Sequence, residues 1–296
     1  MVNVLLPCML RSLLAFALFA ALAGTSQVAA RSGECEAIPL IARAGVEASP
    51  SASALRVVSL NLAKETRATA IQEELSRFES LRAADILLLQ EVQAPAGDRP
   101  GGVEELAERM GLHFLYCPAH LWKDGSREGL AILSRYPLEN VSVIRLPAFD
   151  LVLKNRCRIA LSAVAVTPIG RVRLVNLHLD SRVTLAERLE QLQPVLSMAG
   201  DLFEPVLVGG DFNTSDLYWL GRVLPVPGPD QEARVRAVLE AAGFRTPFVQ
   251  NEPTFDLMGL RLDSIYVRGM IWTDSGMQSI SFSDHRALWV SLEPVP

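Results

Sequence analysis

The sequence has no excess of positive charge. Its 28 Lys and Arg residues are outnumbered by 33 Asp and Glu residues, which gives a formal net charge of -5. A protein that holds nucleic acid mainly by charge is usually basic, so this balance disfavours a tight non-specific DNA binder. It leaves a nuclease open, because a local basic groove can coexist with a net acidic surface. No repeated period is visible either, which disfavours a solenoid or a propeller.

Cysteine is scarce as well. The four cysteines, Cys8, Cys35, Cys117 and Cys157, include no pair with the spacing of a metal site. We expect them to be structural or simply small buried residues. In an oxidising compartment, one pair among the last three could form a disulfide and leave one thiol free.

The first part of the chain differs from the rest. It carries a single charge, Arg11, an apolar run at 13–23 and small residues at 28–30. This order is typical of a cleaved secretory signal peptide, and the apolar run is short for a bilayer span. An uncleaved anchor is the alternative, and translation from Met9 instead of Met1 would place Arg11 beside the terminus. We therefore expect an exported protein, periplasmic or secreted, without a stable membrane span after cleavage.

Composition divides the chain into three segments. A signal peptide is expected at 1–30, a flexible linker of small and polar residues with prolines at 31–54, and one folded domain at 55–296. Within the domain, apolar runs with strand and helix periods alternate. The continuous run at 86–89 is typical of a strand buried on both faces. Hairpins mixed with strand–helix–strand units predict an α/β sandwich of two packed sheets with helices outside.

Polar residues that could carry chemistry stand at the ends of the apolar runs, where a rigid scaffold can direct them into one cleft. They are Asn61, Glu91, His178, Asp211, Asn213, Asp263, Asp284 and His285.

Asn61 and Glu91 provide an amide oxygen and a carboxylate. Both are hard oxygen ligands that suit Mg²⁺ or Mn²⁺, which keep several waters and complete their shell with substrate phosphate. Taken alone, Glu91 could cap the next turn and Asn61 could open one.

The segment Gly209-Gly210-Asp211-Phe212-Asn213 is more specific. The glycines permit a tight exit from the strand, and Asp211 and Asn213 share a side if the chain stays extended. The acid could orient or deprotonate water while the amide donates to a phosphoryl oxygen. The alternative is an Asp-Asn turn without chemistry.

Two of the four histidines have neighbours that favour function. A lone histidine after a strand is often structural, but Asp284 precedes His285, and Asp263 could orient its imidazole or help to hold a metal. His178 follows another strand. His113 and His120 have no such neighbours, and we expect surface or packing roles for them.

These motifs, in this order, resemble those of the endonuclease/exonuclease/phosphatase superfamily over residues 55–293. The segment 129–134 (GLAILS) and the pair Arg188 and Gln191 add to the resemblance. It implies a four-layered α/β sandwich, in which two packed mixed β-sheets are flanked by helices, as in deoxyribonuclease I. It also implies a Mg²⁺ or Mn²⁺ ion held principally by Glu91, with Asn61 beside it and Asp284 as a further contact.

The resemblance assigns catalytic roles to the remaining five residues. Asp211 activates or positions the attacking water, and Asn213 holds a phosphoryl oxygen. His285, oriented by Asp263 or a nearby acid, stabilises the transition state or moves a proton. His178 contacts phosphate and assists the leaving group.

The substrate stays open at this stage. His178 stands where abasic endonucleases usually carry Tyr, and the stretch 261–266 lacks the sequence of the inositol phosphatases, which puts both activities in doubt. Nucleic acid, a phospholipid head group and a phosphorylated metabolite are the candidate partners of an expected monomer. A catalytically dead binding module on the same fold is disfavoured, because all the acids and both histidines are present.

Overall fold

The computed structural model describes residues 40–45, 54–97, 101–151, 156–249 and 252–295. The predicted signal peptide at 1–30 and most of the predicted linker at 31–54 lie outside the described residues and stay predictions. A short strand, β1 (Ile41–Arg43), lies inside the predicted linker segment and pairs with residues 114–116. Among the described residues, no helix is both long and apolar enough to cross a membrane.

The first sheet has seven strands, in which only the central pair β2 and β3 is parallel. Beyond β1, its strands in spatial order are β4 (His113–Leu121), β5 (Arg127–Ser134), β3 (Ile86–Ala94), β2 (Leu55–Asn61), β14 (Ala287–Pro294) and β13 (Met270–Gln278).

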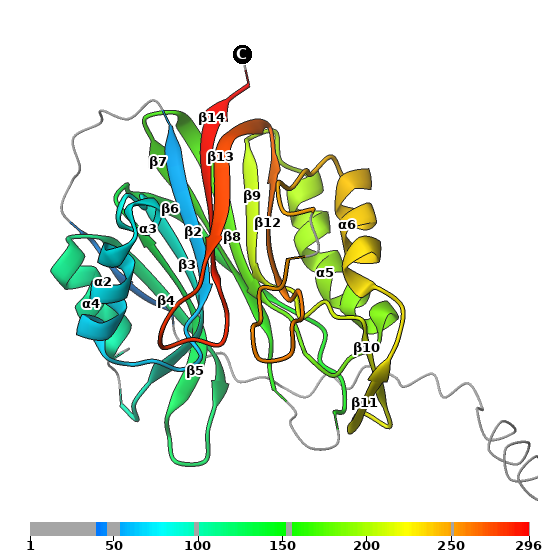
Figure 1. Cartoon of the computed structure of the whole chain (residues 1–296). Helices are drawn as coiled ribbons and strands as arrows, with labels where there is room; N and C mark the ends of the chain where they lie inside the picture. The colour runs from blue at the N-terminus through cyan, green and yellow to red at the C-terminus, as the bar shows by residue number, and fades with distance from the viewer. Residues whose placement is uncertain (1–39, 46–53, 98–100, 152–155, 250–251, 296) are drawn as a thin grey trace, which may run out of the picture. The chain divides into compact units, whose positions relative to one another are not determined.

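The second sheet has five strands, in which only the pair β8 and β9 is parallel. Its spatial order is β12 (Asp263–Arg268), β9 (Val206–Asp211), β8 (Gly170–His178), β7 (Ile159–Thr167) and β6 (Leu138–Arg145). A separate hairpin, β10 (Leu217–Leu220) and β11 (Leu224–Pro227), projects beside it (Figure 1).

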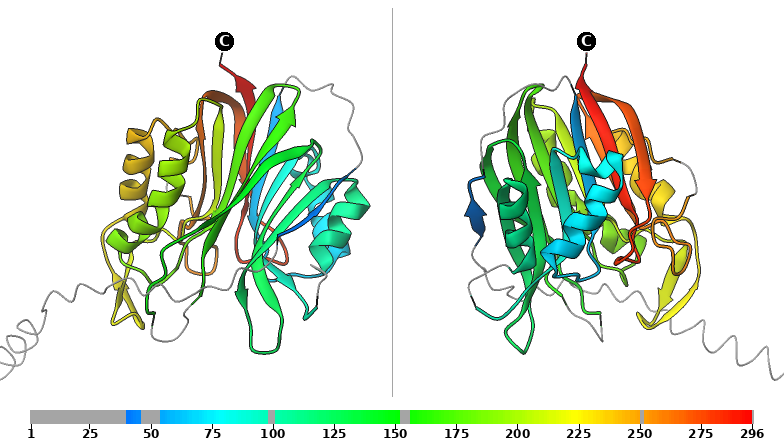
Figure 2. Two further views of the ribbon diagram at one scale, coloured as in Figure 1. Left: turned by 180° about the vertical axis from the view of Figure 1, so that it is seen from behind. Right: turned by 60° about the vertical axis from the view of Figure 1, so that its left-hand side comes forward.

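Helices cover the outer faces of the two sheets (Figures 1 and 2). Those on the first sheet are α2 (Ala68–Arg77), α3 (Glu79–Arg82) and α4 (Gly102–Met110), and those on the second are α5 (Leu185–Gly200) and α6 (Gln231–Ala241). The four layers confirm the predicted deoxyribonuclease I-like α/β sandwich of two packed mixed sheets.

The alternation of side chains along β3 shows why a continuous apolar run is required there. Ile86 and Leu88 join the core between the two sheets, whereas Leu87 and Leu89 join the core under the helices. All four side chains are at most 1% exposed. The strand is therefore buried on both faces, as its sequence predicts.

Gly210 is the second-to-last residue of β9 and lies inside the sheet. Its φ is +139°, and a β-carbon there would collide with the backbone carbonyl of Leu177 on the adjacent strand. Gly210→Ala should therefore destabilise the protein by about 2 kcal/mol, because both the strained φ and the collision must be relieved. Chemical denaturation measures this change. Gly200→Ala is the matched control, since a β-carbon there meets no neighbouring atom, and equal stability of the two variants would contradict the prediction.

Candidate active site

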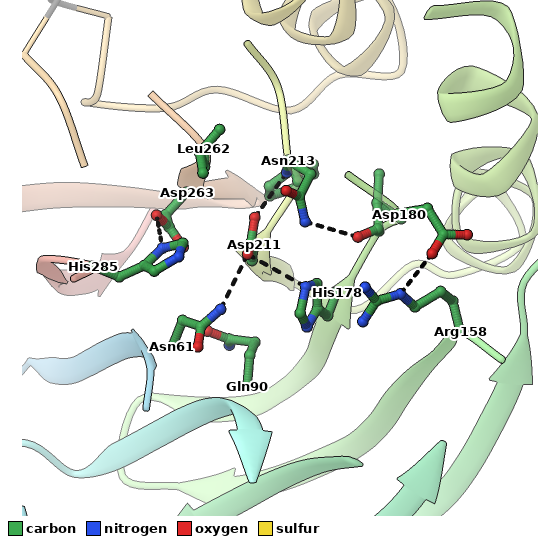
Figure 3. Close-up of polar contacts among 12 residues, drawn as sticks. Asn61, Gln90, Arg158, His178, Asp180, Asp211, Asn213, Leu262, Asp263 and His285 are labelled. Carbon is green, nitrogen blue, oxygen red and sulfur yellow. Dashed lines mark hydrogen bonds and ion pairs between the residues drawn. The ribbon is translucent and has the colours of Figure 1, made fainter. Parts of the chain in front are cut away.

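Three residues of the candidate site form a row across the strands of the second sheet. His178 ends β8, Asp211 ends β9 and Asp263 begins β12. The strand register places His178 opposite Asp211 and Asp211 opposite Asp263. Three residues that are far apart in the sequence therefore lie side by side at one edge of the sheet (Figure 3).

The first sheet adds Asn61, at the end of β2, and Glu91, within β3. A bulge interrupts β3, because Gln90 and Glu91 both lie between the pairs that Leu89 and Val92 form with β5. Glu91 has a φ of +50°, which is rare for a non-glycine residue and costly to maintain. Such a bulge re-aims a side chain, and here Glu91 lines the same cavity as His178 and Asp211.

The Asp211 carboxylate accepts a hydrogen bond at each of its two oxygens. It is 2% exposed, and its Oδ1 accepts a hydrogen bond of 2.8 Å from the backbone N–H of Asn213. Its Oδ2 accepts 3.1 Å from Asn61 Nδ2 and lies 3.4 Å from His178 Nε2. Burial and the nearby Asp263 charge raise the pKa of Asp211 above its ordinary value, which makes it a stronger base than an exposed aspartate.

His285 and Asp263 form a second unit of the site. His285 Nδ1 lies 2.8 Å from Asp263 Oδ2, which also accepts a 2.7 Å hydrogen bond from the Thr254 hydroxyl. Burial lowers the pKa of His285, but the charge and hydrogen bond of Asp263 outweigh this and raise it to about 10. His285 is therefore an imidazolium at neutral pH.

His178 has the opposite state. Burial, followed by the positive charge of Arg158, holds the pKa of His178 well below its ordinary value. Its ring is neutral at pH 7, so the site combines one neutral and one charged imidazole. The structure places the neutral ring beside Asp211 and the charged ring beside Asp263.

The site residues surround a cavity of about 450 Å³. Six of the eight predicted residues line it: Glu91, His178, Asp211, Asn213, Asp284 and His285. Asn61 and Asp263 are 1% and 4% exposed and lie behind this lining, where they hold Asp211 and His285.

Asn213 has a φ of +52°, and its Nδ2 donates 2.8 Å to the carbonyl of Leu179. This hydrogen bond ties the segment after β9 to the segment after β8, while the Asn213 side chain still lines the cavity.

Two groups of oxygen and nitrogen atoms could hold a cation. Asp211, Asp263 and His285 bring one atom each within 4.8 Å of one another. The hydrogen bond between Asp263 and His285 explains that approach without a metal. The Glu91 carboxylate, by contrast, has no hydrogen bond or ion pair with any of the described residues, although it faces the cavity. An unpaired, partly buried carboxylate fits a hard divalent cation better.

Arg158 is a sheltered cation of the cavity that none of the motifs in the sequence singles out. Its side chain is 9% exposed, and its Nε donates 2.9 Å to Asp180, which is buried two residues after His178. Arg156 is similarly sheltered by Glu128 at 2.8 Å. The signal available in the sequence was position, since Arg158 directly precedes β7 and Arg156 lies two residues earlier.

Trp122 is flanked by two cations. The Arg156 guanidinium lies 5.0 Å and the Lys64 ammonium 5.7 Å from its ring centre. Both cations line the cavity, as do Arg158 and Arg182. Together with the charged His285, they give the cavity the positive groups that an anionic substrate requires.

The strand ends of the two packed sheets bring together neighbouring carboxylates, an imidazolium and a cavity lined by cations. This combination is typical of the metal-dependent hydrolases of phosphoric esters. The model of the Endonuclease/Exonuclease/phosphatase family matches residues 58–285, and the chain belongs to this family. It is a metal-dependent phosphoric ester hydrolase, as its motifs predict. No curated protein matches the chain significantly.

Solved structures share the fold. An endonuclease/exonuclease/phosphatase from Beutenbergia cavernae is 19% identical, with a TM-score of 0.65 over 82% of this chain and 72% of its own. The human Nocturnin catalytic domain with bound sulfate is 20% identical, with a TM-score of 0.61 over 82% and 94%. TDP2 from D. rerio with a single-strand DNA product is 17% identical, with a TM-score of 0.58 over 82% and 100%. At these identities the likeness concerns the fold alone.

Proposed function

We propose that the protein is an exported hydrolase in which Asp211 positions and deprotonates a water molecule for in-line attack at phosphorus. The observation that carries this proposal is the fixed geometry of the Asp211 carboxylate. Both of its oxygens have partners, from Asn61 and from the Asn213 backbone, so the carboxylate cannot rotate away. A base held in this way needs no reorganisation as the reaction begins.

His285 stabilises the charge that develops on the phosphoryl group. Its Nδ1 is committed to Asp263, which fixes the ring and leaves Nε2 for the cavity. His178 Nε2 lies beside Asp211, where it contacts the phosphate and assists the leaving group. Asn213 adds an amide at the cavity wall for a phosphoryl oxygen.

Glu91 would hold the divalent metal, with Asn61 and Asp284 as the neighbouring oxygen donors. The donors are hard oxygen atoms, so Mg²⁺ or Mn²⁺ is the proposed ion. When bound, the ion supplies Lewis-acid stabilisation of charge on the phosphoryl oxygens. Asn61 already uses its Nδ2 for Asp211, and its Oδ1 accepts from the Ala63 backbone, so only one lone pair remains for a metal.

Metal removal tests the assignment. EDTA should abolish hydrolysis of bis-p-nitrophenyl phosphate, and Mg²⁺ or Mn²⁺ should restore it. Glu91→Gln should raise the metal concentration for half-maximal activity by at least about tenfold, because a neutral amide binds a hard cation weakly. Glu139→Gln, at an exposed ion pair of β6, is the control. An unchanged metal requirement in Glu91→Gln, together with a raised one in His285→Gln, would move the ion to the Asp211, Asp263 and His285 group.

The predicted signal peptide and the disulfide of Cys157 both support export. Cys157 is disulfide-bonded, and Cys117 is a buried free thiol. Stable disulfides are typical of oxidising compartments. We propose a periplasmic or secreted monomer with its catalytic domain at 55–296. Mass spectrometry of the mature protein from the native host gives its start, and an intact residue 1–30 segment would contradict cleavage.

The substrate is an anionic phosphoester, for which the cavity offers Lys64, Arg156, Arg158 and Arg182. Similar folds bind a sulfate anion in Nocturnin and a single-strand DNA product in TDP2, and ANGEL2 is a 2',3'-cyclic phosphatase. Nucleic acid, a phospholipid head group and a phosphorylated metabolite remain candidates. A panel of DNA, RNA, phospholipid and sugar phosphates on the purified mature protein, with and without metal, compares them.

A further inference from the structure

Three segments project at the end of the molecule that carries the active site. They are the tip of the β4–β5 hairpin, the β10–β11 hairpin and the segment 255–260. Figures 1 and 2 show both hairpins extending beyond the body of the two sheets at this same end. Each segment presents at least one large apolar side chain to solvent.

The exposure on these segments is unusual. Fourteen large apolar side chains among the described residues are exposed, and seven of them belong to these three segments: Leu121, Tyr218, Leu220, Val223, Leu224, Leu257 and Met258. Leu220 and Leu224 face each other as a cross-strand pair and are 55% and 56% exposed, and Leu257 is 77% exposed. Single exposed apolar residues need no explanation, but a concentration of them around one opening indicates a contact surface.

This apolar rim is continuous with the catalytic cavity. Leu217, Trp219 and Met258 come from the projecting segments and line the cavity itself. The Arg182 guanidinium lies 4.9 Å from the Trp219 ring centre, so a cation stands directly beside the apolar side chains. The entrance is therefore amphipathic, with cations toward the phosphate site and apolar groups toward solvent.

We propose that these three tips insert into a lipid bilayer surface and that the enzyme hydrolyses a phospholipid head group presented there. The inference rests on the proposed phosphoester hydrolysis and names its substrate class. Water would add to phosphorus, the bond from phosphorus to one ester oxygen would break, and that oxygen would leave with a proton as an alcohol. The apolar chains of the lipid stay in the bilayer, against the apolar rim, while the phosphate reaches the cations.

A lipid surface explains the position of the rim better than a second copy of the chain. A partner protein seated on all three tips would cover the mouth of the cavity and block the substrate. A membrane in the same place instead delivers the substrate to that mouth. Aromatic side chains such as Tyr218 and Trp219 also suit the boundary between head groups and acyl chains.

The charges at the tips indicate which lipids matter. Lys123 is exposed near one tip, and Arg222 in the turn of the β10–β11 hairpin is paired with Glu187. The exposed acids Asp124, Asp216 and Asp256 stand beside the same segments. The tips carry no net positive charge that would select anionic lipid. Binding should therefore depend on apolar insertion, occur on phosphatidylcholine vesicles and persist at high salt.

The test measures cosedimentation of the full mature chain with phosphatidylcholine vesicles. The double variant Leu220→Ser/Leu224→Ser should weaken binding by at least about tenfold, because two leucine side chains no longer leave water. Phe203→Ser is the matched control. Phe203 is the most exposed large apolar side chain in the described part of the chain. It precedes β9, at the opposite end of that strand from Asp211, so its removal should leave binding unchanged.

Activity separates this inference from the proposed function. Hydrolysis of soluble bis-p-nitrophenyl phosphate should be the same in the wild type and the double variant, while hydrolysis of vesicle phospholipid should fall with binding. Failure of the wild type to bind vesicles, or equal binding by the double variant, would overturn the membrane inference. So would a concentration-dependent dimer that the double variant loses. Absence of metal-dependent hydrolysis of every phosphoester would instead overturn the proposed function.

Discussion

Asp211→Asn should lower kcat/KM for any phosphoester by at least about 10³-fold, because it removes a fixed general base and its charge together. The substitution keeps the volume of the side chain, and an amide oxygen can still accept from the Asn213 backbone. The amide nitrogen, however, would face a donor at Asn61 Nδ2. Steady-state kinetics with bis-p-nitrophenyl phosphate at saturating metal measures the loss.

Stability data distinguish a chemical effect from misfolding in this variant. Asp211 is a buried carboxylate with a raised pKa, so its neutral amide replacement removes the cost of burying a charge. This gain offsets the new amide donor that faces Asn61, and the free energy of unfolding should stay within about 1 kcal/mol of the wild type. Asp274→Asn on the exposed β13 is the matched control for the loss of one carboxylate and should be fully active. A folded Asp211→Asn protein with near wild-type turnover would refute the role of Asp211 as the base.

The fold and the row of site residues follow from short-range features of the sequence. An apolar run that ends in a polar residue predicts a strand with a functional end, and this pattern located His178 and Asp211. Parallel pairing of β8 with β9 then aligns the two strand ends. The buried run of β3 likewise has one physical explanation, since no residue in it can face water.

Other features depend on contacts between distant segments. From the sequence alone, Glu91 could cap a turn after the strand. The structure instead places it at a bulge within β3. The bulge arises from pairing with β5 and leaves no local signal. Arg158 has the appearance of a surface residue until Asp180, 22 residues later, becomes its partner. The short strand β1 is fixed in the same way by its pairing with β4.

The apolar tips show a further limit of sequence patterns. Residues 221–230 are rich in proline and glycine, which predicts a loop. The structure instead forms a hairpin whose turn contains Gly221 and Arg222 at positive φ. The exposure of Leu220 and Leu224 follows from the projection of this hairpin, which the order of residues alone does not reveal.

Arg188→Met should destabilise the protein by about 4 kcal/mol, because it leaves three buried acceptors without their donor. Arg188 is fully buried on α5, and its guanidinium donates to the carbonyls of Asp180 at 2.7 Å and Phe212 at 2.8 Å, and to Gln231 Oε1 at 2.9 Å. These carbonyls belong to the chain segments just after His178 and just after Asp211. One cation therefore joins the two strand ends that carry the site.

Two opposing effects decide the size of this loss. Burial lowers the pKa of Arg188 to about 10, so the cation is costly to bury and its removal gains some stability. The unpaired carbonyls, together with the loss of a positive charge near Asp180 and Asp211, cost more, since each buried orphan acceptor costs about 1–3 kcal/mol. Denaturation midpoints measure the balance, and Arg171→Met, at an exposed ion pair of β8, should change stability by less than about 0.5 kcal/mol. A variant as stable as the wild type would mean that desolvation of the cation dominates. Activity should then also survive, because the two strand ends would not need the guanidinium to hold their places.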